Sequence, residues 1–117
     1  MVSFFCFYST IIKAQTTTIL DSQFEQVLIN LGLDNVIDGG VLTANIDTLT
    51  VLDLEQIFVA INITDLTGIQ DFTALVYLTI SPLVNVLDVT QNIFLEYLSC
   101  NSSYLLTLEV TILILWM

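Results

Sequence analysis

The segment Asp34-Asn-Val-Ile-Asp38-Gly-Gly holds the residues of this sequence whose spacing is closest to a chemical site. Carboxylates placed ahead of a glycine, which permits a sharp turn, are typical of the first half of a calcium loop. The third ligand position of such a loop falls on Val36, however, and the twelfth on Asn45, where a bidentate glutamate is expected. A plain Asp/Asn/Gly turn explains the same residues. We therefore predict no cofactor, with calcium at Asp34 and Asp38 as the alternative.

The composition excludes most of the chemistry that enzymes use. The 117 residues include twelve acidic residues, one lysine (Lys13), no arginine and no histidine, with a formal net charge of −11. The common catalytic triads and metal-histidine sites cannot be built, so we expect a protein that is not an enzyme. Nucleic acid is excluded as a partner because phosphate binding needs a cationic surface. Since 56% of the residues are hydrophobic, the carboxylates serve most simply to solubilise the chain.

The chain opens on an apolar run, residues 2–12, which is followed by Lys13-Ala-Gln and three threonines. The run is too short to span a bilayer and sits where the hydrophobic part of a secretory signal peptide would sit. We predict a signal peptide over residues 1–14, no membrane span, and a secreted or cell-surface location; a buried N-terminal strand is the alternative. Without the leader Cys100 would be the one remaining cysteine, and we expect a small buried hydrophobe there rather than a reactive thiol.

A short amphipathic helix is predicted after Asp21. Ser22 is expected to cap it with Glu25 reaching back, and an apolar stripe runs at helical spacing from Phe24 to Leu31. Gly32 fits the left-handed position that ends a helix. We interpret residues 15–48 as an N-terminal helical cap and lead-in.

The rest of the chain, residues 49–117, repeats itself. Leu75-Val-Tyr-Leu-Thr-Ile is answered by Leu95-Glu-Tyr-Leu-Ser-Cys, and Leu87-Asp-Val-Thr by Leu108-Glu-Val-Thr. A period of about 20 to 21 residues with leucine at fixed phase is typical of a solenoid. We predict an α/β solenoid of about three coils with parallel strands, headed by the helical cap.

In this register Leu52, Leu78 and Leu98 stack in the core, and so do the residues two positions later in each strand. The single residue between the two core positions of each strand faces outward. Small hydroxyls, tyrosines and carboxylates on such a face suit contacts with a protein or glycan. A solvated sheet face without a ligand is the alternative. The candidate binding residues are Asp53, Tyr77, Thr79, Glu96, Tyr97 and Ser99.

Four segments carry a family resemblance: the helix from Asp21, Val41-Leu-Thr-Ala-Asn-Ile, Ile63-Thr-Asp-Leu-Thr-Gly-Ile-Gln-Asp-Phe-Thr-Ala-Leu and the Leu-Asp-Val-Thr repeats. Together they resemble secreted leucine-rich repeat proteins of Bacteroidetes-type bacteria, and the segment from Ile63 is also similar to internalin-like repeats. The resemblance implies a short leucine-rich repeat array that acts as an extracellular interaction module. The family's turn asparagines are replaced here, by Ser103 in one repeat and by Pro82-Leu in the other.

The last thirteen residues, 105–117, contain one charge and no capping element. An apolar, β-prone edge of this kind favours self-association. Three hypotheses for function therefore stand: a secreted or surface module for protein or glycan binding, a calcium-dependent structural module, and a non-functional fragment of a longer repeat protein.

Overall fold

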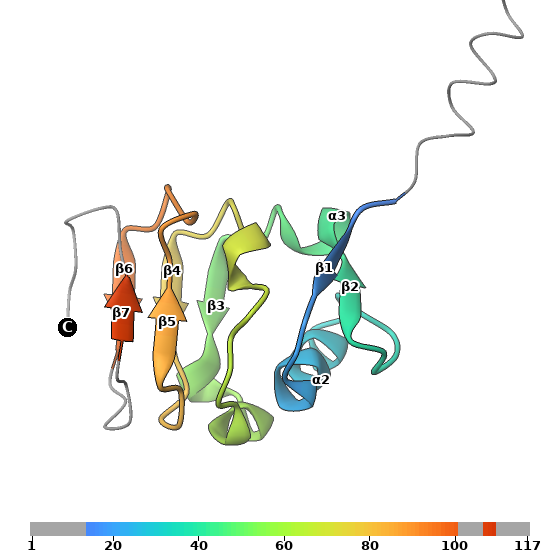
Figure 1. The fold of residues 1–117 in the computed structure, drawn as a ribbon, viewed down its shortest axis with the longest axis horizontal. Coiled ribbons are helices and arrows are strands. Elements are labelled where there is room, and N and C mark those ends of the chain that lie inside the picture. The colour runs from blue at the N-terminus through green and yellow to red at the C-terminus, as the bar shows by residue number, and fades with distance from the viewer. Residues whose placement is uncertain (1–13, 101–106, 110–117) are drawn as a thin grey trace, which may run out of the picture.

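The computed structural model describes residues 14–100 and 107–109 of the chain. The elements follow in chain order (Figure 1): β1 (Thr16–Thr18), α2 (Ser22–Asn30), β2 (Gly40–Leu42), α3 (Thr43–Ile46), β3 (Val51–Asp53), the 3₁₀ helices η1 (Leu54–Gln56), η2 (Phe58–Asn62) and η3 (Ile69–Asp71), then β4 (Tyr77–Thr79), β5 (Val86–Asp88), β6 (Tyr97–Ser99) and β7 (Thr107–Glu109). Every strand in the described residues is three residues long, and the central side chain of each strand from β1 to β6 is buried.

The helix α2 begins at a carboxylate. Asp21 accepts hydrogen bonds from the backbone N–H groups of Gln23, at 2.8 Å, and Phe24, at 3.4 Å. This satisfies two of the N–H groups that a helix start leaves without a partner. The predicted cap of Ser22 with Glu25 is wrong: Asp21 is the N-cap, and the side chain of Glu25 points into the fold.

The end of α2 follows the prediction. Gly32 has a φ of +80°, and the N–H of Leu33 donates to the carbonyl of Leu28 at 2.8 Å. This is the bond that closes a helix through a left-handed glycine. The predicted helix and its glycine stop are therefore confirmed.

The strands form three small sheets. β1 and β2 pair antiparallel, β3, β4 and β6 form a parallel sheet in that order, and β5 pairs with β7 in a second parallel sheet. Leu52, Leu78 and Leu98 are aligned across the three-stranded sheet and are each at most 1% exposed. The predicted alignment of these leucines is confirmed, because a three-residue strand with one buried leucine has one register that keeps the leucine inside.

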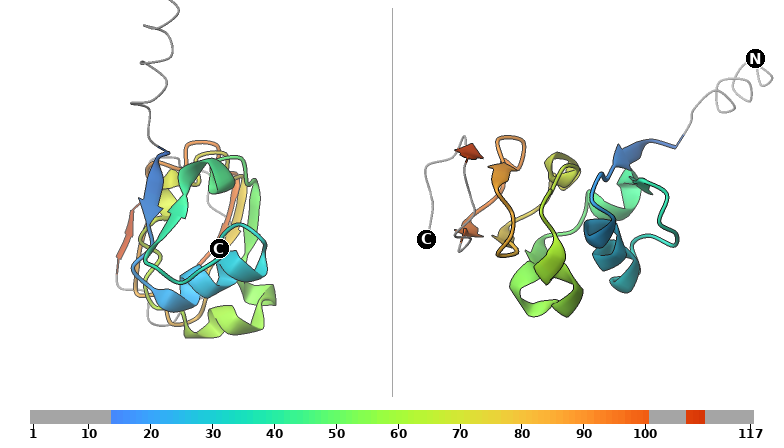
Figure 2. Two further views of the ribbon diagram at one scale, coloured as in Figure 1. Left: turned by 90° about the vertical axis from the view of Figure 1, so that its right-hand side faces the viewer. Right: turned by 60° about the horizontal axis from the view of Figure 1, so that its bottom comes forward.

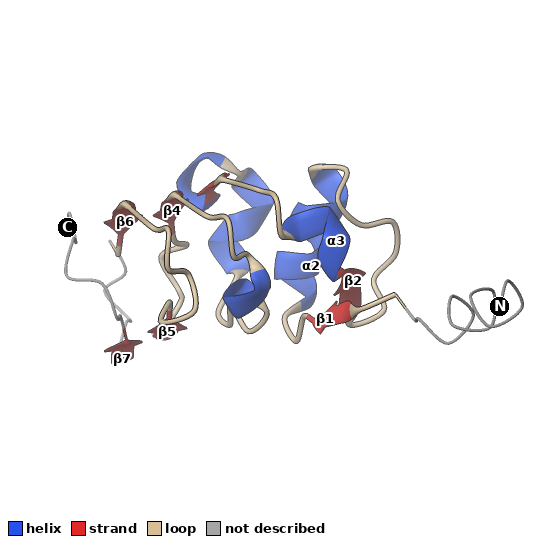
Figure 3. Ribbon diagram, turned by 90° about the horizontal axis from the view of Figure 1, so that it is seen from above, coloured by secondary structure: helices blue, strands red, loops and turns tan. Residues whose placement is uncertain are grey.

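The two parallel sheets lie on opposite sides of a common core. Figure 2 (left) and Figure 3 show the three-stranded sheet on one side and β5 with β7 on the other. Leu78 of the first sheet and Leu87 of the second are both buried in the core between them. Phe24 of α2 stacks on Phe72 with ring centroids 5.9 Å apart, which joins the helix to the same core.

The predicted fold class, a regular leucine-rich repeat solenoid, is wrong. The structure is a small α/β fold that combines two α-helices, an antiparallel pair of strands and short parallel sheets. Its connections are unequal, since 26 residues separate aligned positions of β3 and β4 but 20 residues those of β4 and β6. The longer connection holds three 3₁₀ helices. The leucine spacing predicts which strands pair, but it does not predict the structure of the segments that connect them.

Several predictions fall outside the described residues. They are the bulk of the signal peptide over residues 1–14, the turn at Ser103, and self-association through the apolar end, residues 105–117, of which only residues 107–109 are described. In the part of the chain that is described, no helix is long and apolar enough to cross a membrane. The division between residues 15–48 and 49–117 stays a prediction.

Gly68 is the position where the backbone tolerates no side chain. Its φ is +112°, and a Cβ there would press on Ile19 Cδ1 and lie 2.8 Å from the carbonyl oxygen of Thr18. Gly68→Ala should lower the free energy of unfolding by more than about 2 kcal/mol, through strain and overpacking together. Gly32→Ala is the matched control, because Gly32 has a φ of +80° with nothing within 4 Å of the added Cβ. It should cost only about 1 kcal/mol of backbone strain. Urea unfolding measures both, and equal losses would contradict the close approach at Gly68.

Candidate binding face and acidic cluster

The outer face of the three-stranded sheet carries a column of aligned side chains, Val51, Tyr77 and Tyr97, which we call the tyrosine column. The two tyrosine rings stack with centroids 4.5 Å apart and an angle of 5° between their planes. Tyr97 is 37% exposed and Val51 is 53% exposed, while Tyr77 between them is half-buried. The parallel register places these side chains side by side, and stacking then fixes the rings.

A polar row runs beside the column on the same sheet. The Thr79 hydroxyl donates to Asp53 Oδ1 at 2.7 Å and accepts the N–H of Glu55 at 3.1 Å. Ser99 Oγ donates to Glu55 Oε2 at 3.2 Å. Because Glu55 belongs to η1, these bonds hold the start of η1 over the sheet. Thr79 is consequently only 2% exposed.

The structure places five of the six predicted binding residues on one sheet, with Glu96 immediately before β6, but gives the six different roles. Tyr97 and Glu96 are exposed and can contact a ligand. Thr79 lies under η1, where no ligand reaches it, and supports the row instead. The half-buried members are Asp53, Tyr77 and Ser99. The exposed part of the predicted face is therefore narrower than the sequence predicts, and it lies around Glu96 and Tyr97.

The surroundings of Tyr77 raise the pKa of its hydroxyl above the ordinary value of 10.0. Burial raises the pKa of Tyr77, and the charges of Asp53 and Glu55 and the neighbouring Tyr97 raise it further. The Tyr77 hydroxyl is thus a neutral group that can both donate and accept a hydrogen bond.

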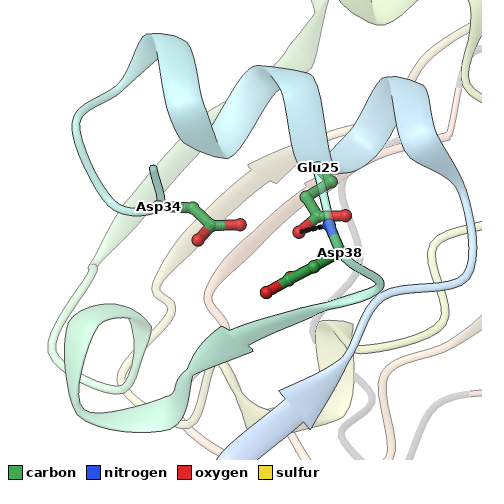
Figure 4. A group of neighbouring side chains, drawn as sticks. All are labelled: Glu25, Asp34 and Asp38. Carbon is green, nitrogen blue, oxygen red and sulfur yellow. Dashed lines mark hydrogen bonds between the residues drawn. The ribbon is translucent and has the colours of Figure 1, made fainter. Parts of the chain in front are cut away.

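A second candidate site is the acidic cluster of Glu25, Asp34 and Asp38 (Figure 4). Glu25 comes from α2, and the two aspartates come from the loop that follows the helix. One carboxylate oxygen from each residue lies within 4.8 Å of the others. Glu25 is 1% exposed, whereas Asp34 is half-buried and Asp38 is exposed. The predicted pair, Asp34 and Asp38, is therefore joined by a buried glutamate.

The carboxylate of Glu25 holds the loop by its backbone. Its two oxygens accept the N–H groups of Gly39, at 2.9 Å, and Asp38, at 3.2 Å. Burial raises the pKa of Glu25, those two N–H groups oppose the rise, and the nearby carboxyls of Asp34 and Asp38 add to it. Asp34 Oδ2 is buried and has no hydrogen-bond partner, which leaves one oxygen of the cluster unsatisfied.

Sequence reasoning missed several polar residues that the fold buries, and Glu25 and Asn92 are the two with clear structural roles. Glu25 was assigned to a helix cap, although it lies three residues before Leu28 and so faces the core with it. Asn92 is 1% exposed, and its side-chain amide donates to the carbonyls of Ile69 and Phe72, both at 2.9 Å. Asn92 aligns with Phe72 at the 20-residue spacing of the repeat, so that alignment could have found it. The chain therefore has a buried turn asparagine after all.

Cys100 is half-buried and packs against the core. Burial raises the pKa of its thiol to about 11. The thiolate form is then scarce at neutral pH, which agrees with the expected role as a small hydrophobe.

Comparison of the chain with protein-family models, with curated proteins and with solved structures returned no match. The resemblance to secreted leucine-rich repeat proteins therefore stays a prediction.

The pKa shifts of Asp21 and Glu25 predict an acidic optimum of stability. Burial opposes the charge of Asp21, but N–H groups of Thr64, Gln23, Asp65 and Phe24 outweigh it and lower its pKa below the ordinary 3.8. The contribution of Asp21 to the stability of the fold is lost as the pH falls through that lowered pKa. Glu25 has a pKa raised above the ordinary 4.5, so its contribution is full below 4.5 and is lost as the pH rises through the raised pKa.

The melting midpoint should therefore be highest near pH 4, between the two ordinary values, and fall on both sides. Circular dichroism melts from pH 2 to pH 8 measure this profile. Asp21→Asn should reduce the fall of the melting midpoint on the acid side of the optimum. Glu25→Gln should reduce the fall on the neutral side. A midpoint that rises steadily from pH 4 to pH 7 in the unmodified chain would contradict the account.

Proposed function

We propose that this chain is a non-enzymatic binding module, secreted or held at a cell surface, that engages a protein or glycan through the tyrosine column. The observation that carries the proposal is the stacked pair of Tyr77 and Tyr97, in register on adjacent strands of one sheet. The extracellular location is supported by the leader-like first fourteen residues.

The tyrosine pair has the properties of a recognition surface. Tyrosine offers an apolar ring and a polar tip, and it is enriched at the centres of interfaces. Because each ring already packs on the other, little side-chain freedom remains to be lost when a ligand binds. The hydrogen bonds among Asp53, Thr79 and Glu55 fix the sheet beneath the rings.

The surroundings of the column favour particular ligands. The nearby carboxylates of Asp53, Glu55 and Glu96 accept hydrogen bonds and repel anions, and the whole chain carries a formal charge of −11. Sugar hydroxyls and the basic or amide groups of a protein surface suit such a face. The lack of histidine and arginine supports binding without catalysis.

Alanine at either tyrosine should weaken ligand binding by at least roughly tenfold, because an interface tyrosine commonly contributes about 2 kcal/mol. The immobilised chain is screened against a glycan array and against secreted proteins, and each hit is titrated with Tyr77→Ala and Tyr97→Ala. Phe58→Ala is the matched control, since Phe58 is 84% exposed and lies in η2. Hits that bind Tyr97→Ala as tightly as the unmodified chain would refute the proposed surface.

Calcium-dependent stabilisation is a second candidate function, favoured by the unpartnered oxygen of Asp34 within the acidic cluster. Calcium takes six to eight oxygen ligands, and carboxylates are common among them. A bound cation would satisfy Asp34 Oδ2 and offset the repulsion between three carboxylates. It would also favour the charged form of Glu25, whose pKa burial raises.

If the cluster binds calcium, a saturating concentration should raise the melting midpoint, and a chelator should reverse the rise. Asp34→Asn should remove most of the rise, while Asp47→Asn, outside the cluster, should keep it. Equal midpoints with calcium and with chelator would eliminate this second function and leave the tyrosine column untouched.

A further inference from the structure

The strand β5 has one edge that no described strand covers. It pairs with β7 on one side in a two-stranded sheet. On its other side lies a groove of about 560 Å³, between residues 64–70 and residues 85–88. We call this the β5 groove. Figure 3 shows that β5 and β7 lie on the side of the molecule opposite to β4 and β6, so the groove is separate from the tyrosine column.

The segment that faces β5 does not close this edge because its own backbone is bonded elsewhere. Asp21 Oδ2 accepts the N–H groups of Thr64, at 2.8 Å, and Asp65, at 3.1 Å. Asp65 Oδ1 in turn accepts the N–H of Thr67 at 2.7 Å. Three of the four backbone N–H groups of residues 64–67 are thus held by carboxylates. Leu66 nevertheless stays buried at 2% exposure, so the segment lines the groove without adding a strand to it.

The groove combines an apolar surface with an acidic rim. The apolar surface of the groove is Val86, which is 51% exposed, while Leu66 and Leu87 belong to the lining although each is at most 2% exposed. The two ionisable residues of the lining, Asp65 and Asp88, are both acidic. The Thr90 hydroxyl and N–H donate to Asp88 Oδ1 at 2.7 and 2.9 Å, and these bonds lower the pKa of Asp88. The rim is therefore negatively charged at neutral pH.

We propose that the β5 groove binds an extended, basic segment of another protein, which adds a strand to the open edge of β5 and pairs a lysine or arginine with Asp65 or Asp88. Strand addition uses backbone hydrogen bonds for affinity and alternate side chains for specificity. Charge complementarity selects a cationic occupant. A second copy of this chain fits poorly, because its only lysine is Lys13 and two acidic edges repel each other.

The probe is an acetylated and amidated heptapeptide in which lysine and valine alternate, titrated into the full chain by calorimetry. It should bind, and binding should weaken as salt is raised from 50 to 200 mM. Two control peptides separate the effect of charge from that of backbone hydrogen bonding. In the first, every lysine is replaced by glutamate; in the second, alternate backbone nitrogens are methylated. Each should lose roughly tenfold or more in affinity, the first through charge and the second through lost backbone hydrogen bonds.

Val86→Lys and Val51→Lys locate the site. Both valines begin the same tripeptide, Val-Leu-Asp, on a three-residue strand, and they are 51% and 53% exposed. Val86→Lys should reduce peptide affinity at least about tenfold by placing a like charge at the groove, while Val51→Lys should not change it. No binding of the basic peptide, equal binding of the methylated peptide, or a loss confined to Val51→Lys would each overturn the proposal. A concentration-dependent dimer that Val86→Lys dissolves would assign the edge to a second copy and overturn it equally.

Discussion

The carboxylate of Asp21 joins two parts of the chain that lie more than 40 residues apart, and the remaining structure depends on this contact. Oδ1 accepts the first N–H groups of α2, and Oδ2 accepts those of Thr64, 43 residues later, and Asp65. The half-buried carboxylate of Asp21 therefore fixes two points of the chain: the start of α2 and the turn at Thr64 and Asp65. Phe24 and Phe72 stack beside this junction. Without it, the start of α2 would lose its hydrogen-bonded link to Thr64 and Asp65 in the wall of the β5 groove, while the buried Phe24 would still hold the helix to the core.

From that junction the fold presents two different surfaces. The three-stranded sheet has one face turned outward, and one buried leucine per strand keeps its register. The same register stacks Tyr77 on Tyr97 and supports them with the hydrogen bonds of Thr79. The second sheet instead leaves an edge open above an acidic rim. A sheet face recognises side chains or sugars, and a sheet edge recognises a backbone, so the two surfaces suit different ligands.

The sequence predicts local features of this protein better than it predicts the fold class. Buried leucines and a glycine helix stop follow from short-range rules, which is why α2 and the strand alignments are found. The prediction of a regular solenoid is wrong because the leucine spacing does not predict the 3₁₀ helices between β3 and β4. Glu25 was missed for a related reason: a glutamate near a helix start usually caps it, and only the loop that brings Asp38 and Gly39 beside it gives it a buried role. The outward positions of Tyr77 and Tyr97 were predicted correctly because alternation in a strand is visible in sequence. The burial of Thr79 was not, because η1 covers it from another part of the chain.

The proposed recognition surface is the face around Tyr77 and Tyr97. It can be located by chemical-shift mapping on the isotope-labelled chain, with a ligand obtained from the glycan or protein screen. We expect the largest perturbations on Val51, Tyr77 and Tyr97, with smaller ones along the polar row. Perturbations centred on the exposed residues of η2, with the tyrosine signals unchanged, would contradict it.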